Sequence, residues 1–317
     1  MQQDMEAGAH QANPVIHRFW QRTNIAAKGG VATRGGSEWN EEVYYLSQYG
    51  RSGEEALRYL YSRRPSFDEF WNWLMLACAS LPVNDDIIAG NVLSEEDHNF
   101  WDTNGYLVVK NVVSKRQCED ARNAIWEFLG AAPADVDSWY QLHAGKQGMM
   151  LDFFQHPALW VNRNATKIRK VYEELYGATP CYLLVDKVSF NAPETDCHRF
   201  NGSRLHWDVS LSQPIPFVLQ GLLYLNDTSA EDGAFHCVPG FHKEIDNWLA
   251  SLPAGADARK IAVEELKPIA IPGSAGDLVI WHQALPHCAT PNRGTMPRMV
   301  QYIAYKPVNM QESTDWK

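Results

Sequence analysis

The chain starts with a polar segment, and the apolar positions that follow it are spaced as in helices. Residues 1–36 are polar and carry two Gly-Gly pairs, which predicts a loose arm without stable structure. Over residues 37–92, Ser52 and Ser66 are each followed three positions later by glutamate, a pattern typical of capping boxes at helix starts. The apolar positions after Ser66 then follow helical spacing. We therefore expect a helical N-terminal extension over 37–92, whose aromatic stripe forms either a core or a lid over a pocket.

The pattern changes after this extension. Capping signals at Ser94 and Ser114 predict two helices, with a strand over 105–113 between them. A further helix is predicted over 165–176, because its apolar positions fall on one face. The first part of this region is therefore mostly helical.

Beyond residue 179 the chain alternates between short apolar runs and turn residues. Many short strands without interleaved helices are typical of a sandwich or jelly roll, and helices followed by strands are the α+β pattern. We therefore expect an α+β protein with a β-sandwich or jelly-roll core and flanking helices. The predicted strands are 181–190, 217–225, 234–238, 261–271, 277–282 and 299–305.

Charge and composition narrow the function classes. The formal net charge is −10 and no basic run is present, which argues against nucleic-acid partners and against an anionic membrane surface. The first residues lack the pattern of a signal peptide, and the longest apolar stretch is too short to span a bilayer. The six cysteines are scattered without a CxxC pair, as in reduced cytosolic proteins. We expect a soluble, cytoplasmic protein.

A possible metal site begins with the sequence His206-Trp-Asp208. In an extended chain, residues two apart share a face, so both side chains can point at one ion. Imidazole and carboxylate suit a first-row divalent metal, and two histidines with one carboxylate are the ligands of non-haem Fe(II) oxygenases. An isolated HxD is weak evidence, because a histidine near an aspartate is common by chance.

A late segment strengthens the metal hypothesis. It supplies two candidates for a third ligand, His282 and His287, and Arg298 follows on the next predicted strand. A planar guanidinium is suited to bind the distal carboxylate of a dicarboxylate cosubstrate through two hydrogen bonds.

Three stretches resemble the phytanoyl-CoA dioxygenase family of 2-oxoglutarate oxygenases. They are LSEEDHNFWDTNGYLVVKNVVS, then HWD with GAFHCVPGFHK downstream, then GDLVIWHQALPHCATPNRGTMPR. The resemblance covers residues 93–307 and implies a dioxygenase domain over 93–310 with a double-stranded β-helix, a jelly roll like that of cupins. Carried over by motif, the metal ligands are His206, Asp208 and His287, and Arg298 binds 2-oxoglutarate.

The resemblance also implies the cofactors and the reaction. These are Fe(II), 2-oxoglutarate and O2, with ascorbate stimulating activity in vitro, and the expected reaction hydroxylates an unactivated C–H bond with succinate and CO2 as co-products. Desaturation, cyclisation and epimerisation are alternative outcomes, and a non-catalytic jelly-roll binding protein is a further alternative. Because Asp208 is retained, halogenation is disfavoured.

Further residues are candidates for cosubstrate or substrate contacts. Lys187 and Asn191, on the strand before HxD, could contact 2-oxoglutarate or be ordinary strand-end polar residues. Arg199 and Arg204 could bind a substrate carboxylate or be solvated loop cations. No basic cluster suits the phosphates of coenzyme A, which favours a small metabolite such as an amino acid or a natural-product intermediate. The N-terminal extension could cover the pocket or form the interface of a homodimer.

Overall fold

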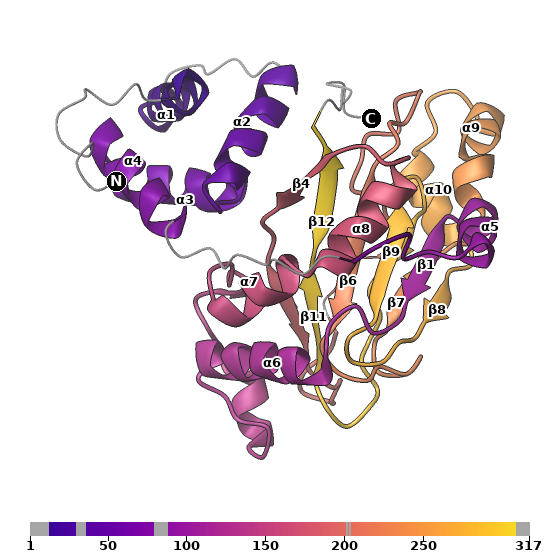
Figure 1. Ribbon diagram of the computed structural model, residues 1–317. Helices are drawn as coiled ribbons and strands as arrows, with labels where there is room; N and C mark the ends of the chain where they lie inside the picture. The colour runs from indigo at the N-terminus through magenta and orange to yellow at the C-terminus, as the bar shows by residue number, and fades with distance from the viewer. Residues whose placement is uncertain (1–12, 30–35, 79–87, 201, 203, 309–317) are drawn as a thin grey trace. The chain divides into compact units, whose positions relative to one another are not determined.

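The computed structural model describes residues 13–29, 36–78, 88–200, 202 and 204–308. The chain divides into two units, Met1–Ser80 and Leu81–Lys317, each with its own hydrophobic core (Figure 1). Among the described residues, none of the helices combines the length and the apolar character that a membrane span requires. Five cysteines are free thiols, and the side chain of Cys78 lies outside the described part of the chain.

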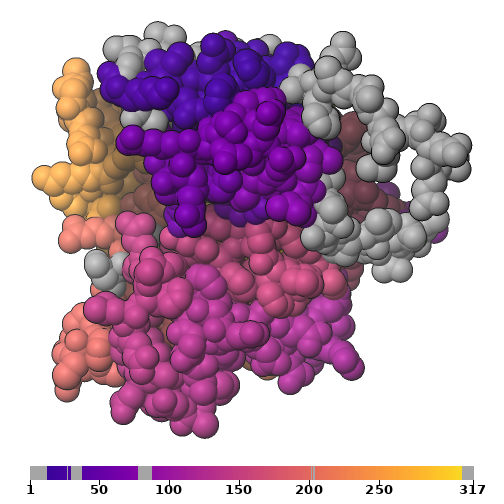
Figure 2. Space-filling model, turned by 90° about the vertical axis from the view of Figure 1, so that its left-hand side faces the viewer, coloured from indigo at the N-terminus to yellow at the C-terminus, as the bar shows by residue number. Residues whose placement is uncertain are grey.

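Helices alone make up the first unit where it is described. They are α1 (Pro14–Ala27), α2 (Gly36–Gln48), α3 (Gly53–Arg63) and α4 (Phe67–Cys78). The predicted capping boxes form at Ser52, before α3, and at Ser66, before α4. Phe70 and Leu74 of α4 are fully buried, so this aromatic stripe contributes to a core. Figure 2 shows the outer face of this unit in indigo to violet.

The prediction of a loose arm over residues 1–36 is wrong for α1. Asn13 accepts a hydrogen bond from the backbone N–H of Val15 and so caps the helix, and Pro14 occupies its first turn, where it costs no hydrogen bond. Ile16 and Phe19, three residues apart, are fully buried in the core of the first unit. This burial stabilises a segment whose average composition is polar. Residues 1–12 and 30–35, also part of the predicted arm, lie outside the described residues.

The second unit combines helices with antiparallel sheets. The capping boxes predicted at Ser94 and Ser114 are both present. The helices of the unit are α5 (Glu95–Asn104), α6 (Lys115–Leu129), the 3-10 helix η1 (Val136–Tyr140), α7 (Pro157–Arg163), α8 (Thr166–Leu175), α9 (Phe241–Ser251) and α10 (Ala258–Glu265).

Three antiparallel sheets form the core of the second unit. The large sheet has the strand order β1 (Tyr106–Val109), β9 (Leu278–His282), β6 (Leu219–Tyr224), β11 (Arg298–Tyr302), β5 (Val188–Asn191), β3 (Met150–Leu151) and β2 (Lys146–Gln147). A small sheet has the order β10 (His287–Cys288), β7 (Phe235–Cys237) and β8 (Ile269–Ile271), and β12 (Ala304–Pro307) pairs with β4 (Cys181–Leu184).

The alternation of side chains along β6 shows how the layers pack. Leu222 and Tyr224 join Phe235 of the small sheet in one core cluster. Leu219 and Leu223 point to the opposite face, where they share a second cluster with residues of α6 and α8 (Figure 1). The large sheet is therefore covered by helices on one face and by the small sheet on the other. The predicted α+β class with a jelly-roll core is confirmed.

Several predicted strands differ from those observed. The single strand predicted over 181–190 is two strands, β4 and β5, because the two halves pair with different partners. The strand predicted over 299–305 is likewise divided, at Ile303, into β11 and β12. The strand predicted over 105–113 ends earlier, at Val109.

The strand predicted over 261–271 is wrong for most of its length. Residues Ala258–Glu265 form α10, and only Ile269–Ile271 form a strand, β8. Asp257 accepts a hydrogen bond from the backbone N–H of Lys260, and this cap favours a helix over the mixed apolar run that follows.

Candidate metal centre

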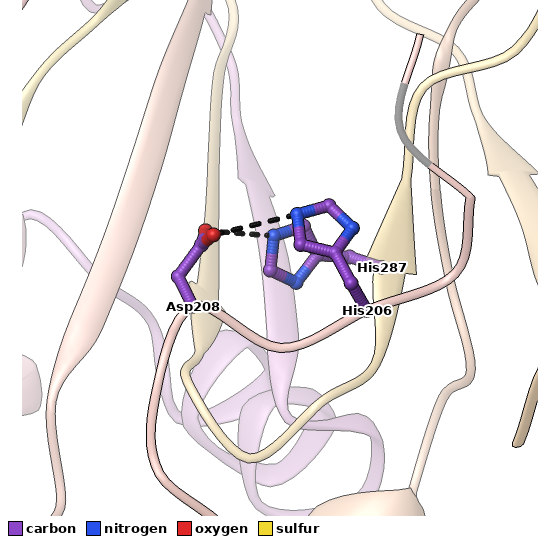
Figure 3. A group of neighbouring side chains, drawn as sticks. All are labelled: His206, Asp208 and His287. Atoms are coloured by element: carbon purple, nitrogen blue, oxygen red, sulfur yellow. Dashed lines mark hydrogen bonds and ion pairs between the residues drawn. The ribbon is translucent and has the colours of Figure 1, made fainter. Parts of the chain in front are cut away.

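His206, Asp208 and His287 converge beside the small sheet (Figure 3). The Nε2 atom of His206 lies 3.4 Å from Oδ1 of Asp208, and Nε2 of His287 lies 3.1 Å from Oδ2. One ligand atom from each residue falls within 4.8 Å of the others. Within the described part of the chain, this is the one group of three or more His, Cys, Asp or Glu side chains that could share a metal ion.

Hydrogen bonds to the backbone orient both imidazoles. Nδ1 of His206 lies 2.8 Å from the carbonyl oxygen of Arg204, and Nδ1 of His287 lies 3.1 Å from that of Leu285. A carbonyl only accepts, so each Nδ1 carries the proton. Each Nε2 therefore presents its lone pair to the centre of the group, as a metal ligand must.

The charge of Asp208 is stabilised by its neighbours. Burial alone would raise the pKa of this carboxyl, but the adjacent imidazoles of His206 and His287 and the hydrogen bond from Gln220 outweigh burial and hold the pKa well below its usual range. For His206, burial lowers the pKa, but the interaction with Asp208 outweighs it and the pKa is raised. Asp208 is thus ionised at neutral pH, the form in which a carboxylate binds a metal.

Three further residues hold Asp208 in place. Gln220 donates to Oδ2 of Asp208 at 2.8 Å, and Trp281 donates to Gln220 at 3.0 Å. Arg259 of α10 donates to the carbonyl oxygens of the two residues that flank Asp208, at 2.8 and 2.7 Å. Gln220 carried a usable signal, since it is the one polar side chain in the apolar run of β6. Arg259 carried none.

A cavity of about 700 Å³ opens onto the three candidate ligands. Arg298 of β11 lines the same cavity and is 1% exposed. Its Nη2 donates to the sulfur of Met149 at 3.5 Å, and its buried Nε has no hydrogen-bond partner among the described residues. Among the described residues, no carboxylate pairs with this guanidinium. The Arg298 guanidinium is therefore a buried cation that forms no ion pair with the described residues.

The other predicted contact residues lie elsewhere. Lys187 pairs with Asp152 at 3.7 Å, and the Asn191 amide donates to the carbonyl oxygen of Thr290 at 3.1 Å. Arg199 and Arg204 are exposed on the loop before His206. None of these four is among the residues that line the cavity. Their roles in binding stay predictions.

The two late histidines occupy different environments. His287 joins Asp208, as described above, whereas Nδ1 of His282 accepts the backbone N–H of Ala284. The His282 ring lies 5.4 Å from the His242 ring and lines a separate cavity of about 410 Å³. Of the two, only His287 meets the geometry of a ligand to the same ion.

Comparison with known proteins extends these observations. The family model described as phytanoyl-CoA dioxygenase (PhyH) matches residues 101–300. A protein of Dictyostelium discoideum that is named for the same family is 22% identical over 273 residues, which are 69% of this chain and 77% of that protein.

Two solved structures share the fold. HygX from Streptomyces hygroscopicus, with nickel and 2-oxoglutarate bound, has a TM-score of 0.50 and is 18% identical, with 70% of this chain and 90% of that chain covered. The non-haem α-ketoglutarate-dependent epimerase SnoN from nogalamycin biosynthesis also has a TM-score of 0.50 and is 18% identical, with 67% and 82% covered.

Proposed function

The chain belongs to the phytanoyl-CoA dioxygenase family of Fe(II)- and 2-oxoglutarate-dependent oxygenases, and from this premise we propose that it hydroxylates an unactivated C–H bond of a small metabolite. In this proposal His206, Asp208 and His287 hold Fe(II), and Arg298 binds 2-oxoglutarate. When bound, the iron supplies the oxidising chemistry with O2 and 2-oxoglutarate, and succinate and CO2 are the co-products.

The buried Arg298 guanidinium is the main structural support for this proposal. A buried charge without a partner is costly, so the site is built for an anion that arrives with a ligand. Arg298 lies in the same cavity as two imidazoles and one carboxylate, which suit a divalent metal and leave positions open for other ligands. A dicarboxylate that binds the metal at one end and Arg298 at the other satisfies both features.

Tyr302 supports the same assignment. It lies on β11 and lines the cavity together with Arg298. Burial raises the pKa of its phenol, so the hydroxyl keeps its proton at neutral pH and can donate a hydrogen bond. We propose that it adds a neutral donor beside the guanidinium.

The remaining cavity wall favours a compact organic substrate. Apart from the metal ligands and Arg298, only Asp186 and Lys306 among the lining residues carry charge. Most of the wall is apolar, including Val209, Val218 and Phe235. Such a wall binds a hydrocarbon framework better than a chain of phosphates. SnoN is a protein of nogalamycin biosynthesis and a HygX structure holds hygromycin B, so natural products are the first compounds to screen.

Succinate release tests the proposal. The purified protein is incubated with Fe(II), ascorbate, 2-oxoglutarate and O2, with and without a panel of metabolites. Succinate is quantified, and the masses of the products are measured by mass spectrometry. We expect succinate and a product 16 mass units heavier than the stimulating compound. No succinate under any condition would support the non-catalytic binding alternative. A product of lower or unchanged mass would instead indicate desaturation, cyclisation or epimerisation.

A matched pair of arginine variants tests the cosubstrate site. Arg298→Ala removes charge-assisted hydrogen bonds worth about 3 kcal/mol, so the 2-oxoglutarate concentration for half-maximal turnover should rise roughly a hundredfold. The iron requirement should change little. Arg293→Ala, in the exposed segment before β11 and near Glu231, is the control. Equal 2-oxoglutarate dependence in the two variants would reject Arg298 as the binding residue.

A further inference from the structure

Gln220 and Trp281 form a cross-strand pair on the cavity wall beside Asp208. They stand directly opposite each other in the register of β6 and β9, and both line the cavity. The indole Nε1 of Trp281 donates to Oε1 of Gln220 at 3.0 Å, and Nε2 of Gln220 donates to Oδ2 of Asp208 at 2.8 Å. An unbroken chain of two hydrogen bonds thus runs from the large sheet to a candidate metal ligand.

The chemistry of both ends fixes the orientation of the Gln220 amide. An indole N–H can only donate, so the amide oxygen must face Trp281. An ionised carboxylate can only accept, so the amide NH2 must face Asp208. A flipped amide would lose both hydrogen bonds and would place its oxygen against a carboxylate oxygen. The pair therefore admits one orientation of the Gln220 side chain.

Trp281 is itself held firmly. It is 3% exposed, and its ring lies 4.3 Å from the Phe235 ring and 5.2 Å from the His287 ring. Packing against the small sheet fixes the direction of its N–H. The hydrogen bond to Gln220 thus starts from a rigid donor.

We propose that Gln220, oriented by Trp281, is the positioning residue that fixes the Asp208 carboxylate for metal binding. The Gln220 amide engages Oδ2, which also lies 3.1 Å from Nε2 of His287, while Oδ1 lies 3.4 Å from Nε2 of His206. The hydrogen bond from Gln220 occupies one lone pair of Oδ2 and so fixes the rotation of the carboxylate between the two histidines. This inference rests on the proposed function only in that the metal is held by Asp208 and the two histidines.

A substrate-binding role for Gln220 fits the contacts less well. The amide oxygen is already engaged by Trp281, and one N–H by Asp208. A single N–H remains for any other molecule. The hydrogen bonds of the Gln220 side chain are therefore used mainly to hold the Asp208 carboxylate.

Cobalt(II) binding to the metal-free protein provides the test. Gln220→Met keeps an unbranched side chain of similar length but removes the donor. We expect it to weaken Co(II) binding about 10–100-fold, as is typical when a residue that supports a metal ligand is lost. The visible absorption of bound Co(II) should also change, because the Asp208 carboxylate can then rotate. Gln283→Met is the matched control, since Gln283 lines the same cavity but donates to the carbonyl oxygen of Pro216.

A double-mutant cycle isolates the role of Trp281. Trp281→Phe keeps an aromatic ring but removes the N–H, and should weaken Co(II) binding by a smaller factor than Gln220→Met. Because Trp281 acts through Gln220, adding Trp281→Phe to Gln220→Met should cause no further loss. Circular dichroism and thermal melting of the metal-free variants check that each is folded. If Gln220→Met does not fold, Trp281→Phe with unchanged affinity and spectrum overturns the proposal by itself.

The outcomes separate this inference from the proposed function. Wild-type affinity and absorption in Gln220→Met, or the full Trp281→Phe effect persisting in the double variant, would overturn the positioning role. A wild-type protein that fails to bind Co(II) would instead remove the metal site on which the proposed function depends.

Discussion

His206 and His287 face each other in an antiparallel bridge in which each backbone N–H donates to the other's carbonyl oxygen, at 3.0 and 2.9 Å. The two candidate ligands are 81 positions apart in the sequence, yet the backbone alone sets the distance between them. Neither imidazole is needed to form this bridge. Loss of a ligand side chain should therefore affect the metal and leave the fold intact.

The first prediction follows from this bridge. His206→Ala should abolish Fe(II) and Co(II) binding and succinate release, while the free energy of unfolding of the metal-free protein changes by less than about 1 kcal/mol. Metal content after dialysis and urea unfolding measure the two quantities. His198→Ala, an exposed histidine on the preceding loop, should keep full metal content. Retained metal in His206→Ala would exclude it as a ligand.

The second prediction concerns Arg259. Its guanidinium donates to the carbonyl oxygens of Trp207 and Val209, and so braces the backbone on both sides of Asp208. Arg259→Ala should weaken metal binding about tenfold, in line with other residues that support ligands. It should also lower the free energy of unfolding by about 1–3 kcal/mol, since two carbonyls lose their donors. Lys260→Ala, an exposed neighbour on α10, serves as the control, and calorimetry of Co(II) binding gives the comparison.

The third prediction concerns the pH dependence of stability. Burial, with a smaller contribution from His242, lowers the pKa of His282 to about 4. In the unfolded chain the pKa is about 6.5. Between these values the unfolded chain binds a proton that the folded protein does not, so stability decreases as the pH falls from about 6.5 to about 4. At 1.36 kcal/mol per pKa unit, the full loss due to His282 is about 3 kcal/mol.

His282→Asn separates this contribution from those of other groups. Asparagine does not titrate, and its side-chain oxygen can replace Nδ1 as the acceptor for the backbone N–H of Ala284. Urea unfolding at pH 7.5 and at pH 4.5 should show a smaller decrease for the variant than for the wild type. Parallel pH profiles would mean that His282 takes up its proton at the same pH in the folded and the unfolded protein.

The fourth prediction tests the division into two units. Phe19 of α1 is fully buried in the core of the first unit, and Phe19→Ala should destabilise that unit by about 3–5 kcal/mol. Because the candidate ligands all belong to the second unit, Co(II) affinity should be unchanged. Ile25→Ala, on the exposed side of the same helix, should have little effect on stability. Loss of Co(II) binding in folded Phe19→Ala would show that the metal site depends on the first unit.

Local signals explain why parts of the fold could be predicted. The capping boxes at Ser94 and Ser114 involve residues three apart, so their geometry is set within one turn of helix. Long-range pairing explains the errors. The apolar run over 181–190 reads as one strand, but its two halves pair with β12 and with β11, which lie more than a hundred residues later.

For the candidate metal site too, some residues could be identified from the sequence and others could not. His206 and Asp208 could be selected as candidates because their two-residue spacing places them on one face of an extended chain. The spacing of His287 and Arg298 matched a family motif. By contrast, Gln220 and Arg259 reach Asp208 only through the pairing of β6 with β9 and the placement of α10, so no local pattern linked either residue to Asp208.

The sequence by itself determined the residue types that can bind a divalent metal and a carboxylate, since side-chain chemistry does not depend on the fold. The tertiary structure decided which of them meet. It joined His206 to His287 through a backbone bridge, buried Arg298 without an ion pair among the described residues, and placed Lys187 beside Asp152, outside the cavity lining. Pairing between distant strands sets these distances, and it depends on the packing of the whole core.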